Sequence, residues 1–425
     1  MKVCLISLGC KVNQYESESI AKKLQENNVE VVFGLSQADV YVLNTCAVTN
    51  EAERKSRGYI TKILKLNPNA KIYVCGCSSQ NNPEKFTQKN NIIAVYGTAK
   101  KMDIADLILQ SLATDKINNA VSECYEDNYV PLPSHTRSYI KIQDGCNNFC
   151  SYCLIPYLRG RSRSRSLESI KNEIEYHSKN SREVVLTGIN LSAYGEDLDK
   201  KLTLLDVANL FKDFINLRFR FSSLEVNIIN DTFLKGLIKL KNFCPHFHLS
   251  LQSGSDNVLK NMNRHYSSQD FLAKVALIRQ YYPNAAITTD VIVGFPTEGE
   301  KEFNESYETC KKAMFAYMHI FPYSPRNGTN ALKLKNIATN VPQRIKELSE
   351  LRDAMQKEFI NSQKGLCYNC LIEAKINNGG YYQGHTENFI KCYIKDDDKN
   401  IKSNVIYNVQ IVKYFKDGAI AIIKN

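Results

Sequence analysis

The sequence has no hydrophobic run long enough to cross a membrane. No apolar segment approaches the ~20 residues that a membrane-spanning helix needs. The short apolar run at residues 3–8 is followed at once by polar residues, so we interpret it as a first core strand rather than a targeting segment. No Gly-x-Gly-x-x-Gly motif follows this strand, which argues against a dinucleotide-binding site.

Acidic residues are fewer than basic ones. The chain carries 55 Lys and Arg against 44 Asp and Glu, which gives a formal net charge of +11. Such a balance favours a polyanionic partner such as nucleic acid, but it says nothing about the fold. With 43% hydrophobic and 23% charged residues, the composition is that of a globular protein, so wholesale disorder is excluded. A length of 425 residues suggests two or three domains.

Cysteine is abundant, with 14 residues in the chain. Secreted proteins stapled by disulfides are usually much shorter, and no export signal is apparent. We therefore expect a cytoplasmic protein in which several cysteines bind a metal or a cluster. Cys367 and Cys370 form a C-x2-C pair without a second half, so a zinc site there is only a minor alternative.

The first 115 residues alternate short apolar strands with amphipathic helical segments, which predicts a doubly wound parallel sheet as domain 1–115. Residues 116–136 are polar and resemble a linker. The expected strands of the first domain are residues 3–8, 30–33, 40–44, 71–74 and 92–96.

A second series of strands and helices predicts a partial (βα)6 barrel related to the TIM barrel, assigned to domain 132–360, with function at the carboxyl ends of its strands. Its expected strands are residues 139–142, 183–186, 218–221, 247–251, 287–293 and 318–321. The remaining residues, 361–425, contain five short strands and predict a small all-β barrel of the oligonucleotide-binding (OB) type.

Three cysteines form a compact C-x3-C-x2-C motif directly after a predicted barrel strand: Cys146, Cys150 and Cys153. Three thiolates from one loop can bind three irons of a cubane cluster and leave the fourth iron open for a small molecule. An incomplete zinc site is the alternative, but zinc normally requires a fourth ligand, and none is evident nearby.

A second set of cysteines is dispersed in sequence but convergent in the predicted fold. Cys10, Cys46 and Cys77 each follow a strand of the first sheet by about two residues. Because the carboxyl ends of parallel strands share one edge, these side chains could meet there. The alternative is three small buried residues in tight turns. Cys75 competes with Cys77, and strand alternation does not separate them.

These motifs together resemble the radical S-adenosylmethionine (SAM) methylthiotransferases over nearly the whole chain. The segment IKIQDGCNNFCSYC followed by RGRSRSR resembles the core signature of that family, and SLGCKVNQYESE is similar to the branch that acts on threonylcarbamoyladenosine in tRNA. Further similar segments are residues 44–49, 186–190, 249–255, 289–296 and 321–329.

The resemblance implies two [4Fe–4S] clusters and SAM as cofactors. Cys146, Cys150 and Cys153 would hold the catalytic cluster that binds SAM, and Cys10, Cys46 and Cys77 the auxiliary cluster. Cys77 is preferred to Cys75 because the family motif places this ligand directly after a glycine. The implied reaction converts N6-threonylcarbamoyladenosine at position 37 of tRNA to its 2-methylthio derivative, with an electron donor and a sulfur donor as partners. The alternatives are the same chemistry on isopentenyladenosine tRNA and an iron–sulfur RNA-binding sensor.

Other site residues are predicted at the mouth of the barrel, where fold-supporting polar groups are the alternative. The expected contacts to SAM are Tyr152, Gly188, Glu225, Gln252 and Arg264. The expected contacts to RNA phosphates or to the threonylcarbamoyl carboxylate are Arg159, Arg161, Arg163 and Arg165. The C-terminal segment resembles the family's TRAM-like RNA-binding barrel.

Overall fold

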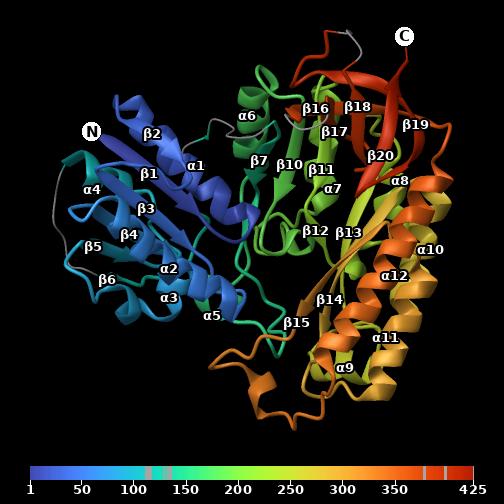
Figure 1. Cartoon of the computed structure of the whole chain (residues 1–425), viewed down its shortest axis with the longest axis horizontal. Helices are drawn as coiled ribbons and strands as arrows, with labels where there is room; N and C mark the ends of the chain where they lie inside the picture. Colours follow the sequence, from blue (N-terminus) through green and yellow to red (C-terminus); the bar gives the residue numbers. More distant parts are fainter. Residues whose placement is uncertain (111–116, 128–129, 132–135, 377–379, 397–399, 425) are drawn as a thin grey trace.

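The computed structural model describes the chain except for residues 111–116, 128–129, 132–135, 377–379, 397–399 and 425. Figure 1 shows three units in the order expected from the sequence. Part of the expected linker 116–136 lies outside the described residues. No helix in the described part of the chain is both long and apolar enough to span a membrane.

The first unit is a six-stranded sheet in which every neighbouring pair of strands is parallel. Its order, β2-β1-β3-β4-β5-β6, confirms the predicted doubly wound sheet. The last edge strand lies beyond the predicted boundary at residue 115. The strands are β1 (Lys2–Ser7), β2 (Glu30–Phe33), β3 (Val40–Thr45), β4 (Lys71–Gly76), β5 (Ile92–Tyr96) and β6 (Ile117–Asn118).

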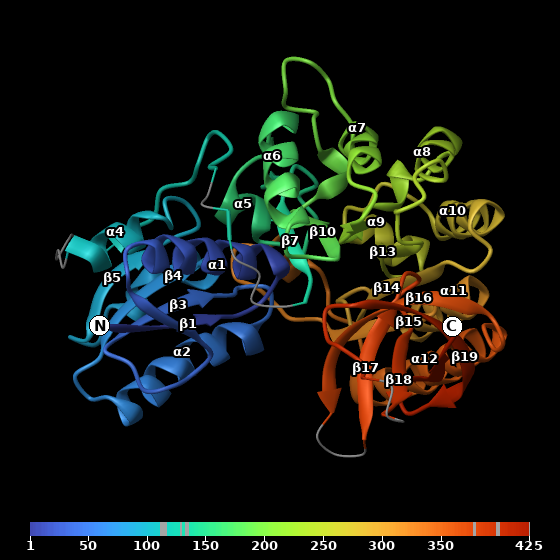
Figure 2. The ribbon, with the colours of Figure 1, turned by 90° about the horizontal axis from the view of Figure 1, so that it is seen from above.

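Helices cover both faces of this sheet. Helices α1 (Lys11–Glu26) and α4 (Asp103–Gln110) pack on one face and α2 (Asn50–Leu66) on the other, as Figure 2 shows. All six residues of β3 are buried, as expected of a central strand covered on both sides. The Thr49 side chain caps α2 by accepting a hydrogen bond from the amide of Ala52.

The second unit is the predicted partial barrel, built from two adjacent parallel sheets of order β11-β10-β7 and β12-β13-β14-β15. Helices α6 (Leu167–Ser178), α8 (Asp231–Leu237), α10 (Ser268–Tyr281), α11 (Glu300–Ala313) and α12 (Val341–Ser362) surround it (Figure 1). The strands are β7 (Ser138–Lys141), β10 (Glu183–Thr187), β11 (Arg218–Phe221), β12 (Ser223–Leu224), β13 (His246–Gln252), β14 (Ala286–Val293) and β15 (Tyr317–Pro322).

Shorter elements connect these strands and helices. They are α3 (Cys77–Asn81), α5 (Ile155–Arg159), α7 (Leu204–Ala208), α9 (Asp256–Asn261), the paired β8 (Gln143–Asp144) and β9 (Arg163–Ser164), and the 3-10 turns Pro83–Phe86, Leu191–Ala193, Asn209–Asp213, Val226–Ile228 and Asn330–Lys333.

The third unit is a closed five-stranded barrel of order β16-β17-β18-β20-β19, which confirms the predicted small all-β barrel. Cys367 is exposed and Cys370 is buried, so the C-x2-C pair does not present two thiols on one surface. The strands are β16 (Cys367–Ile376), β17 (Tyr381–Thr386), β18 (Lys391–Lys395), β19 (Ile406–Phe415) and β20 (Gly418–Ile423).

This C-terminal barrel covers the amino-terminal end of the central barrel. Glu183, which is buried, pairs with Arg218 at 2.6 Å and with Arg220 at 3.2 Å. Arg218 also donates to the backbone carbonyls of Asn369 and His385 in the third unit. The ring of Phe389 stacks on His246, with 4.6 Å between ring centroids. The amino-terminal end of the central barrel is therefore closed, and a reactant can approach only from the carboxyl ends of its strands.

Arg137 and His385 both bind Glu373 at this junction, at 2.5 and 2.6 Å. Although burial alone would raise it, these contacts hold the pKa of Glu373 at about 2. A lowered pKa stabilises the folded state above the ordinary value of 4.5, and this contribution is lost as the pH falls towards 2.

We expect Glu373→Gln to lower the free energy of unfolding by about 1–3 kcal/mol at pH 7, because it leaves a buried charge pair incomplete. Denaturation curves between pH 7 and pH 3 should show this difference shrinking below pH 4.5. Glu358→Gln, on the exposed side of α12, is the control. A difference that does not depend on pH would contradict the assignment.

Candidate metal centre

The loop with Cys146, Cys150 and Cys153 follows β8 and is fixed by its surroundings. The backbone amide of Ser151 donates to the carbonyl of Met262 at 3.0 Å. Each of the three sulfurs accepts an N–H hydrogen bond. The donors are the amide of Asn148 to Cys146 at 3.5 Å, Arg264 Nη1 to Cys150 at 3.3 Å and the amide of Ile155 to Cys153 at 3.4 Å.

Cys10, Cys46 and Cys77 follow β1, β3 and β4, at the shared carboxyl edge of the first sheet. Cys46 packs against Gly9, where an added Cβ would lie 2.6 Å from the Cys46 sulfur. The three sulfurs are near enough for Cys10 and Cys77 each to raise the pKa of Cys46. The structure thus brings the dispersed set together.

Cys75 lies apart from this group. It is fully buried in β4 and packs in the hydrophobic core that faces α1 and α4. Cys77 belongs to a different cluster, with Ala47, Leu154 and Leu158. Because the glycine between them turns the chain from strand into helix, the two thiols reach different places, and the geometry favours Cys77 as a ligand.

The two cysteine sets lie on facing loops. Leu154 and Leu158 follow Cys153 and pack on Ala47 and Cys77 of the first unit. Arg159, which ends α5, donates from Nε to the Cys77 sulfur at 3.4 Å. The loop that carries one set is therefore packed directly on the loops that carry the other.

A buried ion cluster holds these loops in place. Glu16 of α1 binds Lys101 at 2.5 Å, Lys141 at 3.0 Å and Arg159 at 3.0 Å. Asp144 binds Lys141 at 2.9 Å and Arg159 at 3.0 Å. Burial alone would raise the pKa of both carboxyls, but the charges of Arg159 and Lys141, with Lys101 at Glu16 and Arg163 at Asp144, hold each well below its usual range. Both acids are thus ionised, and they bind the two units together.

This cluster corrects one sequence prediction. Arg159 is 1% exposed, Arg163 7% and Arg165 3%, so these guanidinium groups lie inside the protein. Arg163 donates to backbone carbonyls at 2.7 and 2.8 Å, and Arg165 pairs with buried Glu173. Their prediction as RNA contacts is wrong because their charges are needed inside the protein. Arg161 is exposed, and its contact to RNA stays a prediction.

The donors at both cysteine sets suit anionic sulfur bound to iron. Burial, ahead of any other cause, raises the pKa of the free thiols of Cys46 and Cys153 to about 12. Without a bound cation, burying these thiolates would cost free energy, so the sulfurs would stay protonated. The N–H donors would then face neutral thiols. A bound cluster supplies the missing positive charge, and N–H···S hydrogen bonds are the usual outer contacts of such thiolates.

A cavity of about 280 Å³ lies beside the first cysteine loop. Asn148, Asn190, Glu225 and Arg264 line it, with Tyr266 at its side. Glu225 and Arg264 form an ion pair with each other. Two of the five predicted SAM contacts therefore share a polar cavity that opens next to the cysteine sulfurs.

The other three predicted SAM contacts do not line this cavity. Tyr152 packs edge-on against Phe295, with 6.5 Å between centroids. At Gly188 an added Cβ would lie 3.0 Å from Gln143 Oε1, so Gln143 packs closely on this glycine. Gln252 ends β13 with a positive φ of 66°. Their roles as SAM contacts stay predictions.

Sequence reasoning missed several residues of the site. Gln143 donates to the Asp144 and Gly145 carbonyls at 2.8 Å and accepts from the Asn190 amide at 2.7 Å, which ties the cysteine loop to the end of β10. Asn148 and Asn190 stand within motifs already noted, so their polar character beside a cluster loop was an available signal. Glu16 also lies in a noted motif, SLGCKVNQYESE, but its buried partners are distant in sequence, and Lys101 lies in no such motif.

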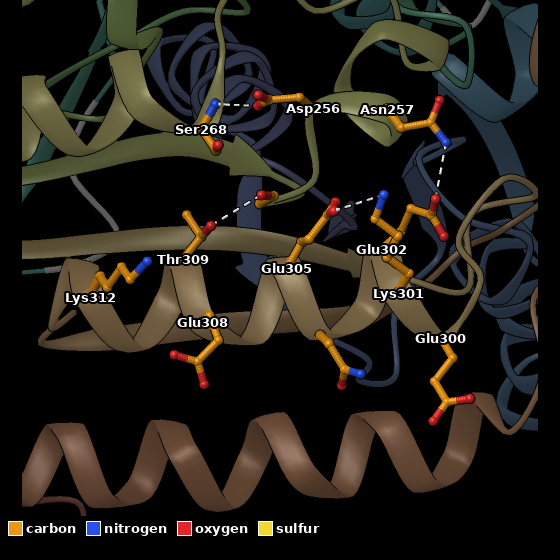
Figure 3. A pocket seen from close by; sticks show the side chains of 12 residues that line it. Asp256, Asn257, Ser268, Glu300, Lys301, Glu302, Glu305, Glu308, Thr309 and Lys312 are labelled. Atoms are coloured by element: carbon orange, nitrogen blue, oxygen red, sulfur yellow. Dashed lines mark hydrogen bonds and ion pairs between the residues drawn. The ribbon is translucent and has the colours of Figure 1, made fainter.

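A larger hollow of about 1210 Å³ lies on the outer side of α9, α10 and α11 (Figure 3). Five carboxylates line it against two lysines, and none of its lining residues is a cysteine. Its negative charge would repel a nucleic acid. We therefore place no RNA contact there. The carboxylates are Asp256, Glu300, Glu302, Glu305 and Glu308.

Comparison with known proteins agrees with this arrangement. Residues 2–97 match the family described as "Uncharacterized protein family UPF0004", and residues 140–310 match the Radical SAM superfamily. The threonylcarbamoyladenosine tRNA methylthiotransferase MtaB of Bacillus subtilis is 35% identical over 97% of this chain and 94% of its own. This chain belongs to the radical SAM methylthiotransferase family.

Other relatives of this methylthiotransferase are named for two different tRNA substrates. MtaB of Thermotoga maritima is 36% identical over 98% of this chain and 95% of its own. A tRNA-2-methylthio-N(6)-dimethylallyladenosine synthase of Thermoanaerobacter sp. is 34% identical over 86% and 80%. The radical SAM methyltransferase TsrM of Kitasatospora setae, at 13% identity and a TM-score of 0.53 over 75% of this chain and 72% of its own, shares the fold alone.

Membership of the radical SAM superfamily implies SAM and one [4Fe–4S] cluster as cofactors of this methylthiotransferase. The assignment of that cluster to Cys146, Cys150 and Cys153 stays a prediction, supported by their loop and its hydrogen bonds.

We expect Glu16→Gln to lower the free energy of unfolding by about 3–5 kcal/mol, because three buried cations lose a shared partner. Glu26→Gln lies in the same helix and removes only the half-exposed pair with Lys22, so it should cost less than about 1 kcal/mol. Chemical denaturation of both variants measures the difference. Equal losses would show that the buried cluster does not hold the units together.

Proposed function

We propose that this protein converts N6-threonylcarbamoyladenosine at position 37 of tRNA to 2-methylthio-N6-threonylcarbamoyladenosine. Relatives named for this reaction are 35% and 36% identical over nearly the whole chain. The observation that carries the proposal is the packing of two three-cysteine sets on facing loops. Relatives named for the dimethylallyl substrate make the same chemistry on isopentenyladenosine the second candidate.

Two separate cysteine sets suit a reaction that needs both a radical and a sulfur carrier. SAM on a [4Fe–4S] cluster at Cys146, Cys150 and Cys153 would supply a 5′-deoxyadenosyl radical, and a second cluster at Cys10, Cys46 and Cys77 the methylthio sulfur. Both must reach carbon 2 of one adenine. The facing loops meet that geometric demand, whereas cysteines on opposite sides of the molecule would not.

The protein's own groups bind, orient and exclude water. Arg264 and Asn148 donate to cysteine sulfurs, and Glu225 is placed to accept hydrogen bonds from ribose hydroxyls of the cofactor in the adjacent cavity. Ala47, Leu154 and Leu158 form an apolar contact between the two sulfur sets, which keeps bulk water from that side. Arg326 lies in the segment 321–329 that follows the barrel strand β15. It pairs with Glu53 of α2 at 2.6 Å and so ties this segment to the first unit.

The partners follow from the reaction. The net charge of +11 and exposed Arg161 suit tRNA, and the C-terminal barrel is the expected RNA-binding unit. A reductive electron donor and a sulfur donor complete the chemistry. We place the protein in the cytoplasm, where tRNA is modified. We keep 132–360 and 361–425 as its second and third domains and extend the first from 1–115 to residue 118, so that it includes β6.

Nucleoside mass spectrometry of tRNA from cells with and without the protein tests the function. We expect 2-methylthio-N6-threonylcarbamoyladenosine to disappear and its unthiolated precursor to accumulate. Loss of the isopentenyl derivative instead would assign the protein to the other branch. No changed nucleoside would contradict a tRNA substrate.

The second cluster has its own test. Changing Cys10, Cys46 and Cys77 together to Ala should lower the iron content from about eight to about four per chain. Cys75→Ala is the matched control and should keep all the iron, because this thiol lies in another core. Iron content and the visible absorption of the reconstituted protein measure both. Iron loss in the control would assign the ligand to Cys75.

A further inference from the structure

Three polar side chains of the central barrel face its interior. Along β13, Phe247, Leu249 and Leu251 belong to the hydrophobic core under the helices, so His248 between them points the other way. The same alternation turns Asp290 of β14 and His319 of β15 inward. We call His248, Asp290 and His319 the lumen group.

The lumen group is compact and ordered. His248 Nε2 lies 3.2 Å from Asp290 Oδ2, and its Nδ1 lies 2.9 Å from the Thr288 hydroxyl. His319 stands opposite Asp290 in the strand register, and one polar atom of each member lies within 4.8 Å of the others. The Asp290 side chain is 29% exposed and His319 is exposed, so the group borders open space.

Lys11 connects the lumen group to the auxiliary cysteine set. It directly follows Cys10, and its charge interacts with those of Asp290 and His319. The Lys11 side chain is accessible, and no ion pair to it is found among the described residues.

The charge around this space favours an anion over a metal ion. Arg137, Arg218 and Arg220 pair with Glu183 near the barrel floor, and Arg137 also pairs with Glu373, so three guanidinium groups share two carboxylates. Lys11, whose charge interacts with those of Arg220 and Arg137, adds a further cation. A divalent cation at the lumen group would meet this surplus positive charge, whereas a carboxylate would be attracted by it.

The substrate of the proposed function carries such a carboxylate. On adenine, carbon 2 and the N6 substituent lie on the same edge of the ring, separated by one nitrogen. A base that presents carbon 2 to the sulfur site at Cys10 therefore brings its N6 group within reach of a neighbouring side chain. The threonylcarbamoyl group ends in a carboxylate and a hydroxyl, and a dimethylallyl group has neither.

We propose that Lys11 binds the carboxylate of the threonylcarbamoyl group and that Asp290, oriented by His248, accepts a hydrogen bond from its hydroxyl. The inference rests on the proposed function and names the residues that select its substrate. An apolar N6 substituent would leave Lys11 and Asp290 without partners, which is an effective way to reject it.

Single-turnover assays on reconstituted holoenzyme test this with three anticodon stem-loop RNAs. These carry threonylcarbamoyladenosine, its methyl ester, or glycylcarbamoyladenosine, which lacks the hydroxyl. With the wild-type protein, we expect the ester to react about 10- to 100-fold less efficiently than the acid, as loss of a charged hydrogen bond predicts. Lys11→Met should react with the acid less efficiently by that same factor, and its efficiency with the ester should equal that of the wild-type protein.

Asp290→Leu, which has a similar shape but no acceptor, should instead abolish the preference for the threonyl over the glycyl RNA and keep the preference for the acid. Lys22→Met, on the same helix as Lys11, is the control and should retain both preferences. Iron content is measured for every variant, so that a lost cluster is recognised. Asp290→Leu keeps the test decisive if Lys11→Met loses iron.

Retention of both preferences in both variants would overturn the inference. Recovery from the wild-type protein of a divalent ion that is not cluster iron, and that His319→Gln loses, would also overturn it, because the lumen group would then be a metal site. If the wild-type protein modifies none of the three RNAs, the proposed function fails before the inference is reached.

Discussion

The buried pairing of Glu16 and Asp144 with Arg159 and two lysines is the constraint on which the rest of the site depends. Charges removed from water are tolerated only when every one has partners at close distance. Glu16 lies on the helix that follows Cys10, Asp144 precedes Cys146, and Arg159 ends the helix that follows Cys153. One set of charges thus fixes both cysteine loops relative to each other.

The same pairing links structure to chemistry through Arg159. Its guanidinium satisfies two carboxylates and still reaches the Cys77 sulfur. The position of an auxiliary ligand is therefore tied to the position of the loop that carries the other cysteine set. At the opposite end of the barrel, Glu183 with its three arginines closes the floor against the C-terminal barrel. Reactants can therefore enter only at the carboxyl ends of the barrel strands.

Net charge is a poor guide to where RNA would bind on this protein. Most of the arginines in RGRSRSR neutralise buried acids or cap carbonyls, and only Arg161 among them is exposed. The hollow beside α9, α10 and α11 is acidic. The surplus of basic residues is thus divided between interior pairing and the surface, which a count along the chain cannot separate.

Sequence alone determined much of this protein. The alternation of apolar strands and helices predicted the parallel sheet and partial barrel, because hydrophobic periodicity is local. The C-x3-C-x2-C spacing singled out one candidate ligand set, since its members are neighbours in the chain. Tertiary structure decided what depends on distant partners: the burial of Arg159, the separate cores of Cys75 and Cys77, and the meeting of His248, Asp290 and His319. A charged side chain looks the same in sequence whether its counter-ion is another residue or a substrate, and only folding brings the counter-ion into place.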